Sequence, residues 1–394
     1  MSSILQKELG PELGSLLTPK FSHYLVRANN FGVIFGGHPY RWNKKDCVTE
    51  LVGRRKQLLW RFNMILGITY VLFVYFRCVQ VNLDSTRSNA QKIYMRIMAA
   101  YMSLSLIAHI SVIQNLGLTD AFSNQYFNFT DTFQRMYSKE DGKTPTMMII
   151  MGLVLQLMYY SINCLTVLMA LNSFLRPTSP EQLTSLMDGE PSLEWRTISA
   201  CFIFYIEYIY HASTLLVMMT FYPALAIFMS MINELSCRHN SMSSVELRTT
   251  VNKFRVYREL QIQIMLLNQI YNYSLVPGVK ILGIAVVIYC TYAGIKMSGI
   301  EAYALGFLGF FMVLLLLATF SFLAEFHLRS TRVLKEWEQQ TQWDENYKYI
   351  RTSLRTFRPL VANIRDSYYV DRRMVLSLAT ILVVNTSNFL LVNN

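Results

Sequence analysis

Seven stretches of this 394-residue sequence are long and apolar enough to cross a bilayer as helices. A spanning helix needs about 20 mostly apolar residues, because every backbone N–H and C=O must be bonded within the helix. The runs are Leu58–Val79, Met95–Leu116, Thr146–Leu171, Thr197–Ile232, Val276–Met297, Ala302–Phe326 and Met374–Val392. The fourth is too long for the bilayer alone, so its end, after Pro223, is predicted to continue outside the lipid. The fold class is therefore predicted to be all-α, an integral membrane protein with seven transmembrane helices.

The composition is that of a membrane protein and not of a soluble one. Hydrophobic residues make up 53% of the chain and charged residues 15%, whereas soluble domains carry about 25% charged residues. The formal net charge is +11, but the basic residues lie between the apolar runs and form no single stripe. These features exclude a soluble enzyme and a nucleic-acid-binding domain.

Basic residues just before the first span indicate a cytoplasmic amino terminus, because Lys and Arg gather on the inner side of a membrane. They are Lys44, Lys45, Arg54, Arg55 and Lys56. Seven crossings then place the carboxyl terminus outside and the segments 233–275 and 327–372 inside. We expect a multi-pass protein of the plasma membrane with this topology.

Two predicted cytoplasmic segments carry apolar residues at helical spacing among charged neighbours. In the first, Leu260, Ile264 and Leu267 recur at steps of three and four, and in the second Ile350 and Leu354 do the same. Each stripe could pack against the chain's own helix ends or against further copies of the chain. The sequence leaves both alternatives open.

The sequence contains no catalytic or metal-binding motif. Its six histidines and six cysteines are scattered, without a C-x-x-C pair, and glycine-rich phosphate loops, H-E-x-x-H and G-x-S-x-G are absent. We therefore expect no enzyme activity, no metal and no cofactor.

Glu207 is the one acid well inside an apolar run, and it lies four residues before His211. Both side chains project from the same helix face. A charge at that depth is costly and faces either a partner or water. The pair could orient a polar ligand, but a Glu–His contact that locks the bundle is favoured because the partner is already within reach.

Aromatic and methionine side chains concentrate in the predicted outer half of the bundle. Interfacial belts and simple packing are the ordinary explanations for most of them, yet several lie too deep for a belt. A small pocket between these helices would suit an uncharged organic ligand. The candidate pocket residues are Tyr101, Met158, Tyr159, Tyr205, Tyr208, His211, Tyr303, Phe307 and Phe310.

The last span becomes polar towards its outer end. Ser387, either Leu390 or Leu391, and Asn394 share a helix face, with Asn393 beside them. Uncharged polar residues around a leucine constriction on several symmetric helices would make a pore with an apolar gate. Composition alone favours the alternative, in which these groups form helix–helix hydrogen bonds.

This layout resembles the arthropod seven-transmembrane chemoreceptor superfamily, the odorant and gustatory receptors that are ligand-gated cation channels. The most specific stretches are Ser-Leu-Arg-Thr-Phe-Arg-Pro-Leu at 353–360 and Tyr-Val-Asp-Arg-Arg-Met-Val-Leu-Ser-Leu-Ala-Thr-Ile-Leu-Val-Val-Asn-Thr at 369–386. The resemblance implies a homotetramer held by cytoplasmic helices, with the last helix of each subunit lining one central pore. It also implies a ligand pocket among the outer halves of spans two, three, four and six.

The family's pore residues carry over onto the end of this chain. Thr386 matches the threonine of the gustatory Thr-Tyr ending, so Ser387 takes the pore position next to it. Leu390 matches the hydrophobic gate and Asn393 the polar glutamine near the end. The chain departs from the family by having Ser387 where tyrosine is common and Asn393 for glutamine.

The resemblance implies a six-part organisation of the chain. The parts are a cytoplasmic amino-terminal segment (1–57), a ligand-binding bundle of transmembrane helices one to four (58–232), cytoplasmic anchor helices (233–275), transmembrane helices five and six (276–326), further anchor helices (327–372) and a pore-lining helix (373–394).

The function that the resemblance implies is a gustatory-like chemoreceptor, a non-selective cation channel opened by a small organic odorant or tastant. It would act as a homotetramer or together with a co-receptor subunit. The alternatives are a seven-helix transporter and a G-protein-coupled-like receptor. A transporter would favour repeats and midplane ionisable groups, and the second rival lacks both an Asp-Arg-Tyr and an Asn-Pro-x-x-Tyr motif here.

Overall fold

The computed structural model describes residue 16 and residues 19–43, 48–139, 144–236, 242–297, 299–341, 347–364 and 368–392. Within these ranges seven helices are long and apolar enough to cross a membrane. They are α3 (Arg54–Leu83), α4 (Asn89–Gln114), α6 (Thr146–Leu175), α7 (Leu193–Leu235), α9 (Leu275–Lys296), α10 (Ile300–Thr341) and α12 (Arg372–Val392). Each contains most of one predicted span, so the all-α, seven-span prediction is confirmed.

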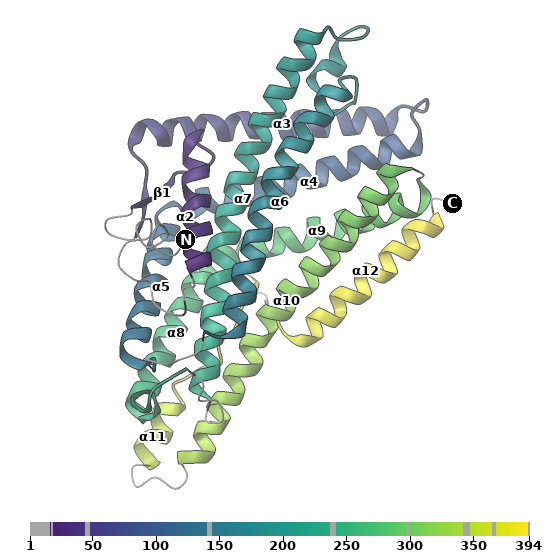
Figure 1. Cartoon of the computed structure of the whole chain (residues 1–394). Helices are drawn as coiled ribbons and strands as arrows, with labels where there is room; N and C mark the ends of the chain where they lie inside the picture. Colours follow the sequence, from purple (N-terminus) through teal and green to yellow (C-terminus); the bar gives the residue numbers. More distant parts are fainter. Residues whose placement is uncertain are drawn as a thin grey trace.

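Two of these helices are much longer than a bilayer needs. Helix α7 has 43 residues and α10 has 42, about 65 Å each, against a hydrocarbon thickness of about 30 Å. Helix α7 continues through Pro223 to Leu235, as the sequence predicts. Helix α10 also continues, past the predicted end of its span at Phe326, because the charged residues that end the apolar run do not end the helix. Figure 1 shows both helices running towards the end of the molecule that carries α8 and α11.

The shorter elements lie between the spans. They are α2 (Pro19–Ile34), α5 (Leu116–Tyr137), α8 (Thr250–Tyr271), α11 (Tyr347–Leu354), 3-10 turns at Leu183–Leu186 and Val245–Arg248, and two antiparallel hairpins, β1 (Tyr40–Asn43) with β2 (Val48–Leu51) and β3 (Asn363–Ile364) with β4 (Tyr368–Tyr369). The first hairpin pairs Tyr40 with Leu51 and Asn43 with Val48. Helices α8 and α11 are the two predicted cytoplasmic stripes, whereas α2 and α5 were not predicted.

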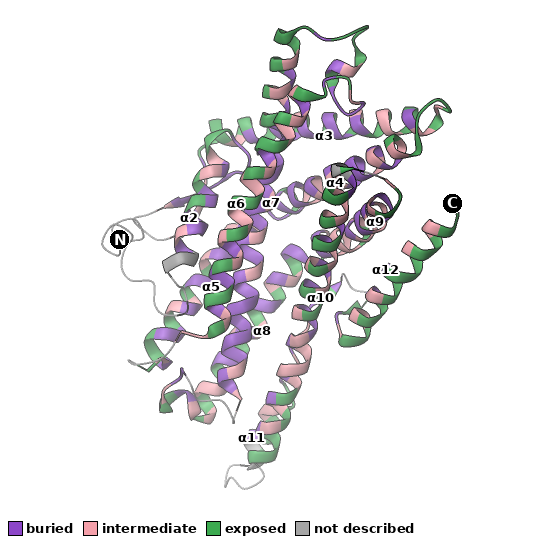
Figure 2. Cartoon of the chain, turned by 45° about the vertical axis from the view of Figure 1, so that its right-hand side comes forward, coloured by how far each residue is buried: buried purple, intermediate pink, exposed green. Residues whose placement is uncertain are grey.

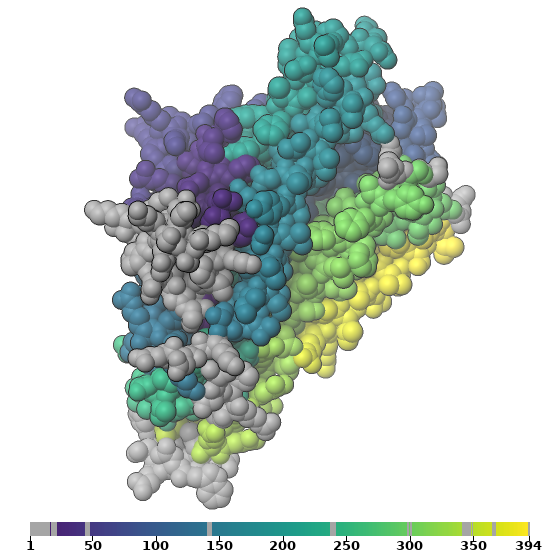
Figure 3. All heavy atoms as spheres, viewed as in Figure 1, coloured from purple at the N-terminus to yellow at the C-terminus, as the bar shows by residue number. Residues whose placement is uncertain are grey.

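Helix α7 is the centre of the bundle and α12 is its edge. Of the most apolar part of each helix, 89% is buried in α7 and only 11% in α12. Figure 2 shows the same contrast, with α7 largely buried and α12 largely exposed. In the space-filling view α12 forms a ridge along one side of the molecule, next to α10 (Figure 3). A single chain therefore leaves most of its last helix uncovered.

Helix α2 packs along α6 and α7, as Figure 1 shows. The Tyr24 and Tyr159 ring centroids are 5.7 Å apart, and those of Phe31 and Tyr208 are 4.4 Å apart. At the end of α2 the chain turns through Gly36, whose φ is +70°, a conformation that glycine adopts at little cost. The segment 1–57 is predicted to be cytoplasmic, and in the structure α2 lies against residues of two predicted spans.

Helix α8 packs against α5 and α7 of the same chain, and α11 packs against α10. The first residues of α8 also reach the segments around α11: the ring centroids of Phe254 and Phe357 are 5.0 Å apart, and those of Tyr257 and Trp337 of α10 are 5.6 Å apart. Leu260, Ile264 and Leu267 are buried. The first stripe was predicted to pack either against the chain's own helices or against further copies of the chain. Within a single subunit it packs against the chain's own helices.

Candidate functional site

An apolar cavity of about 210 Å³ lies within the bundle. Its walls come from α4, α6, α7, α9 and α10, which converge around the central α7. The apolar lining includes Leu104, Ala108, Ile162, Val217, Phe221, Val286, Leu308, Met312 and Phe320. These residues come from five helices between Leu104 and Phe320 of the sequence. Only the fold brings them together.

Tyr101 and His211 contact each other and form a polar corner of the cavity. The other polar residues of the lining are Ser105, Thr214, Tyr222 and Thr319. The hydroxyl of Tyr101 lies 2.6 Å from Nε2 of His211 and donates to Oε2 of Glu207 at 3.1 Å. The other ring nitrogen of His211, Nδ1, lies within hydrogen-bond distance of a second hydroxyl.

That hydroxyl belongs to Thr166 of α6, 2.7 Å from Nδ1 of His211. The network therefore joins α4, α6 and α7. Glu207 and His211 themselves are 3.7 Å apart, so Tyr101 makes the closer contact with each. The sequence pairs the acid with the imidazole and includes Tyr101 among the pocket aromatics, but it does not indicate that this tyrosine, more than a hundred residues away, bridges the two.

Three of the predicted pocket tyrosines lie outside this cavity. Tyr159 and Tyr208 pack against α2, and Tyr208 donates a hydrogen bond to the carbonyl of Phe31. Tyr205 donates to Oδ1 of Asn63 at 2.8 Å. Asn63 lies nine residues after the start of α3, about 14 Å along its axis, so these tyrosines are level with the first part of that span. Met158, on the same helix as Tyr159, is half-buried and does not line the cavity.

The predicted aromatics of α10 point away from the bundle. Tyr303, Phe307 and Phe310 are 80%, 71% and 61% exposed. The opposite face of the same helix lines the cavity through Leu308, Phe311, Met312 and Leu315. Sequence reasoning missed this face because both faces of the helix are apolar, so hydropathy alone cannot choose between them.

Helix α12 has one packed face and one exposed face. Leu378 and Leu382 are buried, and the Phe389 ring centroid lies 4.9 Å from that of Tyr292 on α9. The opposite stripe is exposed and follows helical steps of four, three and four residues. It consists of Thr380, Val384, Ser387 and Leu391.

The two candidate gate leucines are placed differently by this packing. Leu390 is half-buried against the core, whereas Leu391 is 71% exposed. Leu391 is the leucine that shares the exposed face with Ser387. Asn393 and Asn394 lie outside the described residues.

The start of α12 is tied to the rest of the bundle by charged groups. Arg372 donates to Glu325 of α10 at 2.7 Å, and Arg329 donates to the same carboxylate at 3.0 Å. Arg329 also donates to Oδ1 of Asn233 at the end of α7, at 2.7 Å. This chain of contacts connects α7, which lines the cavity, to the first turn of the last helix. Among the described residues no group of three His, Cys, Asp or Glu side chains could hold a metal ion.

These features define a class of protein: a seven-helix membrane protein with an internal apolar cavity, two spans that extend as long helices, and a terminal helix that one chain leaves uncovered. This is the fold of the insect olfactory receptors.

Two solved structures carry the comparison, both of the insect olfactory receptor OR5 from Machilis hrabei. The first aligns with a TM-score of 0.60 at 13% identity, and the second, in complex with eugenol, with 0.65 at 12% identity. Each alignment covers 95% of this chain and 100% of the other. No protein-family model matches the sequence. The comparison with curated proteins finds no relative.

Proposed function

We propose that this chain is the subunit of a ligand-gated, non-selective cation channel of the plasma membrane, opened by a small uncharged organic molecule. The observation that carries the proposal is the apolar cavity with one polar corner, in a fold shared with a solved olfactory receptor. The subunit would lie with its amino terminus in the cytoplasm and assemble as a homotetramer or with a co-receptor subunit.

The cavity supports a small neutral ligand. Its volume of about 210 Å³ is below the range of about 300–1,000 Å³ that drug-sized ligands occupy. A charged ligand would lose its hydration without gaining a partner of opposite charge among the lining residues. The polar corner formed by Tyr101 and His211 suits a single hydroxyl or carbonyl group. A receptor of this fold has been solved with eugenol, which makes eugenol a sensible first probe.

The exposed stripe of α12 supports a pore. In a tetramer, four such stripes around one axis would present Thr380 and Ser387 to water and close the passage at Leu391. Ligand binding would open the passage because the cavity's affinity for the ligand differs between the closed and open states. The contacts from α7 through Arg329 and Glu325 to Arg372 would transmit the change.

Patch-clamp recording from cells that express the chain tests this function. Neutral volatile compounds, eugenol among them, and sugars are applied to the wild type, alone and with a co-receptor subunit. We expect a cation current for at least one compound. Ala108→Leu, which fills part of the cavity, should raise the half-maximal concentration about 5- to 150-fold, since overpacking costs about 1–3 kcal/mol. Ala108→Ser, which adds little volume, should leave the response nearly unchanged. A surface-expressed protein that gives no current under either condition contradicts the proposal.

A further inference from the structure

A second, polar cavity of about 720 Å³ lies at the end of the molecule where α3 meets α4 and α6 meets α7. The sequence predicts this end to be outside the cell. The cavity is lined by the first residues of α4, by the loop between α6 and α7, and by Met297 just after α9. None of its lining residues belongs to the apolar cavity.

The lining of this outer cavity is electropositive. It contains Arg87, Arg176 and Arg196 against a single carboxylate, that of Glu190. Ala90 and Gln91 belong to the first turn of α4, and Arg196 to the first turn of α7. Backbone N–H groups at a helix amino terminus add partial positive charge. Side chains and backbone therefore favour the same sign of ligand charge.

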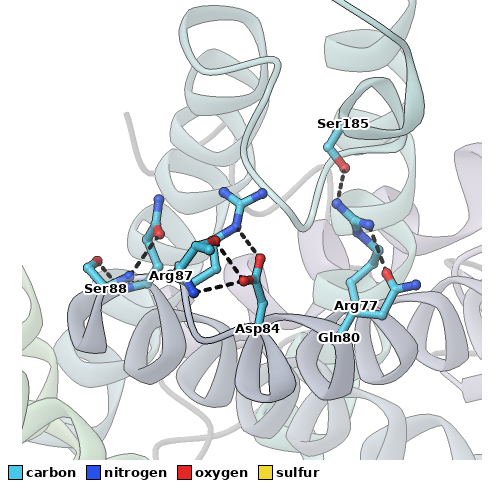
Figure 4. A network of polar contacts seen from close by, with 8 residues as sticks. Arg77, Gln80, Asp84, Arg87, Ser88 and Ser185 are labelled. Carbon is cyan, nitrogen blue, oxygen red and sulfur yellow. Dashed lines mark hydrogen bonds and ion pairs between the residues drawn. The ribbon is translucent and has the colours of Figure 1, made fainter.

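The carboxylates near Arg196 and Arg87 do not hold these two side chains fully. Glu190 is 3.1 Å from Arg196, but its side chain is 86% exposed, and such exposed pairs contribute little. Asp84 is 3.3 Å from Arg87 and already accepts two hydrogen bonds from Thr86. Figure 4 shows Asp84 and Arg87 in the turn between α3 and α4, with Ser185 of the cavity lining bonded to Arg77 nearby. An incoming anion could bind the guanidinium groups of Arg87 and Arg196 without breaking a buried ion pair.

The floor of the cavity carries a polar group that is incompletely bonded. Tyr94 lines the cavity and donates to Oε1 of Glu181 at 3.1 Å. Glu181 is 1% exposed, and within the described part of the chain its Oε2 has no hydrogen-bond partner. Burial raises the pKa of Glu181, and the nearby charge of Arg176 acts in the opposite direction. Tyr94 and Tyr101 lie seven residues apart on one face of α4, so the two cavities follow one another along that helix, about 10 Å apart.

We propose that the outer cavity is a second binding site, which takes a small soluble organic anion between Arg176, Arg196 and Arg87. Guanidinium groups match the planar geometry of carboxylates, and the volume admits a polyol acid. The site is separate from the apolar cavity, and the proposal does not depend on channel activity.

Calorimetric titration of the full chain in neutral-lipid nanodiscs tests the site, with gluconate as the probe and glucose as its uncharged counterpart. Ionic strength is held constant because salt screens exposed charges. We expect saturable gluconate binding in the millimolar range or tighter, and no saturable glucose binding. Arg196→Gln and Arg176→Gln should each weaken gluconate binding about tenfold, since a hydrogen bond to a charged group contributes to that extent.

Lys92→Gln is the matched control, because it removes one positive charge beside the cavity without removing a lining side chain. It should leave gluconate binding unchanged. If Arg196→Gln fails to fold, Arg176→Gln and Arg87→Gln carry the test. The proposal is overturned if gluconate shows no saturable binding, if glucose binds equally well, or if Lys92→Gln weakens binding as much as the cavity variants do.

Discussion

The hydroxyl of Tyr101 on α4 lies 2.6 Å from Nε2 of His211 on α7, and both side chains line the same apolar cavity. The contact sits where a ligand's polar group would meet the protein. It also joins two neighbouring helices, one of which continues to the contacts that hold the start of α12. A ligand that engages either side chain would therefore act on the packing of α4 against α7.

Tyr101→Phe should destabilise the protein and change its ligand response. The variant removes a hydroxyl that serves Glu207 and His211, and leaves the buried carboxylate with one partner fewer. We expect a loss of about 1–3 kcal/mol in unfolding free energy and a shift in the half-maximal ligand concentration. Thermal unfolding in detergent and concentration–response recordings measure the two effects. Tyr75→Phe, which removes an exposed hydroxyl bonded to Ser103 at 2.7 Å, should have a much smaller effect on both.

Leu391→Ala and Leu390→Ala should differ in their effect on the closed channel. Leu391 lies on the exposed stripe with Ser387, whereas Leu390 packs against the core. Leu391→Ala should raise the ligand-free current by removing the apolar constriction. Leu390→Ala should act mainly on stability and surface expression. Basal current normalised to surface protein separates them, and a larger basal current from Leu390→Ala would assign the gate to the other leucine.

The positions of the seven spans can be predicted from hydropathy alone. The cavity cannot, because hydropathy does not show how the helices pack or which of their faces point inward. All seven long apolar runs are helices, because in lipid the backbone N–H and C=O groups of such a segment must form hydrogen bonds with one another. Helix α2 escaped prediction because its 16 residues are too few and too polar to resemble a span. It nevertheless buries the tyrosines that were predicted to bind a ligand.

The sequence also does not show which face of an apolar helix points towards the cavity. On α10 the exposed Tyr303 and Phe307 and the cavity-lining Leu308 and Phe311 are all apolar, so only packing against α9 decides which of them face the cavity. Tyr101 and His211 could be predicted because a polar side chain inside a span needs a partner. Their purely apolar neighbours in the lining carry no such signal.

Glu325→Gln should uncouple the start of α12 from α10. The carboxylate holds Arg372 at 2.7 Å and Arg329 at 3.0 Å. Because these groups are partly exposed, we expect a coupling between positions 325 and 372 of about 0.5–1 kcal/mol. A double-mutant cycle with Arg372→Gln, read out as the open–closed equilibrium, measures it. Additive effects of the two substitutions would show that the pair does not take part in gating.

Glu181→Gln should make stability less dependent on pH. Burial raises the pKa of Glu181 in the folded protein above its ordinary value of 4.5, so the folded state binds more protons than the unfolded state above that pH. Unfolding free energy should therefore fall as pH rises from 4.5 through the raised pKa. The glutamine variant keeps an acceptor for Tyr94 and should lose this part of the slope. Thermal midpoints of both proteins between pH 5 and pH 8 measure the difference, and parallel curves would contradict it.

We propose that the exposed face of α12 lines a pore that ligand binding opens. The decisive experiment is modification of Ser387→Cys by a positively charged thiol reagent, applied from outside while ligand holds the channel open. We expect an irreversible block of the ligand-evoked current, faster with ligand than without. Phe389→Cys, on the face packed against Tyr292, and the wild type with its own cysteines should be unaffected. If modification of residue 387 is verified by mass spectrometry and the current is unchanged, the pore does not run along this face of α12.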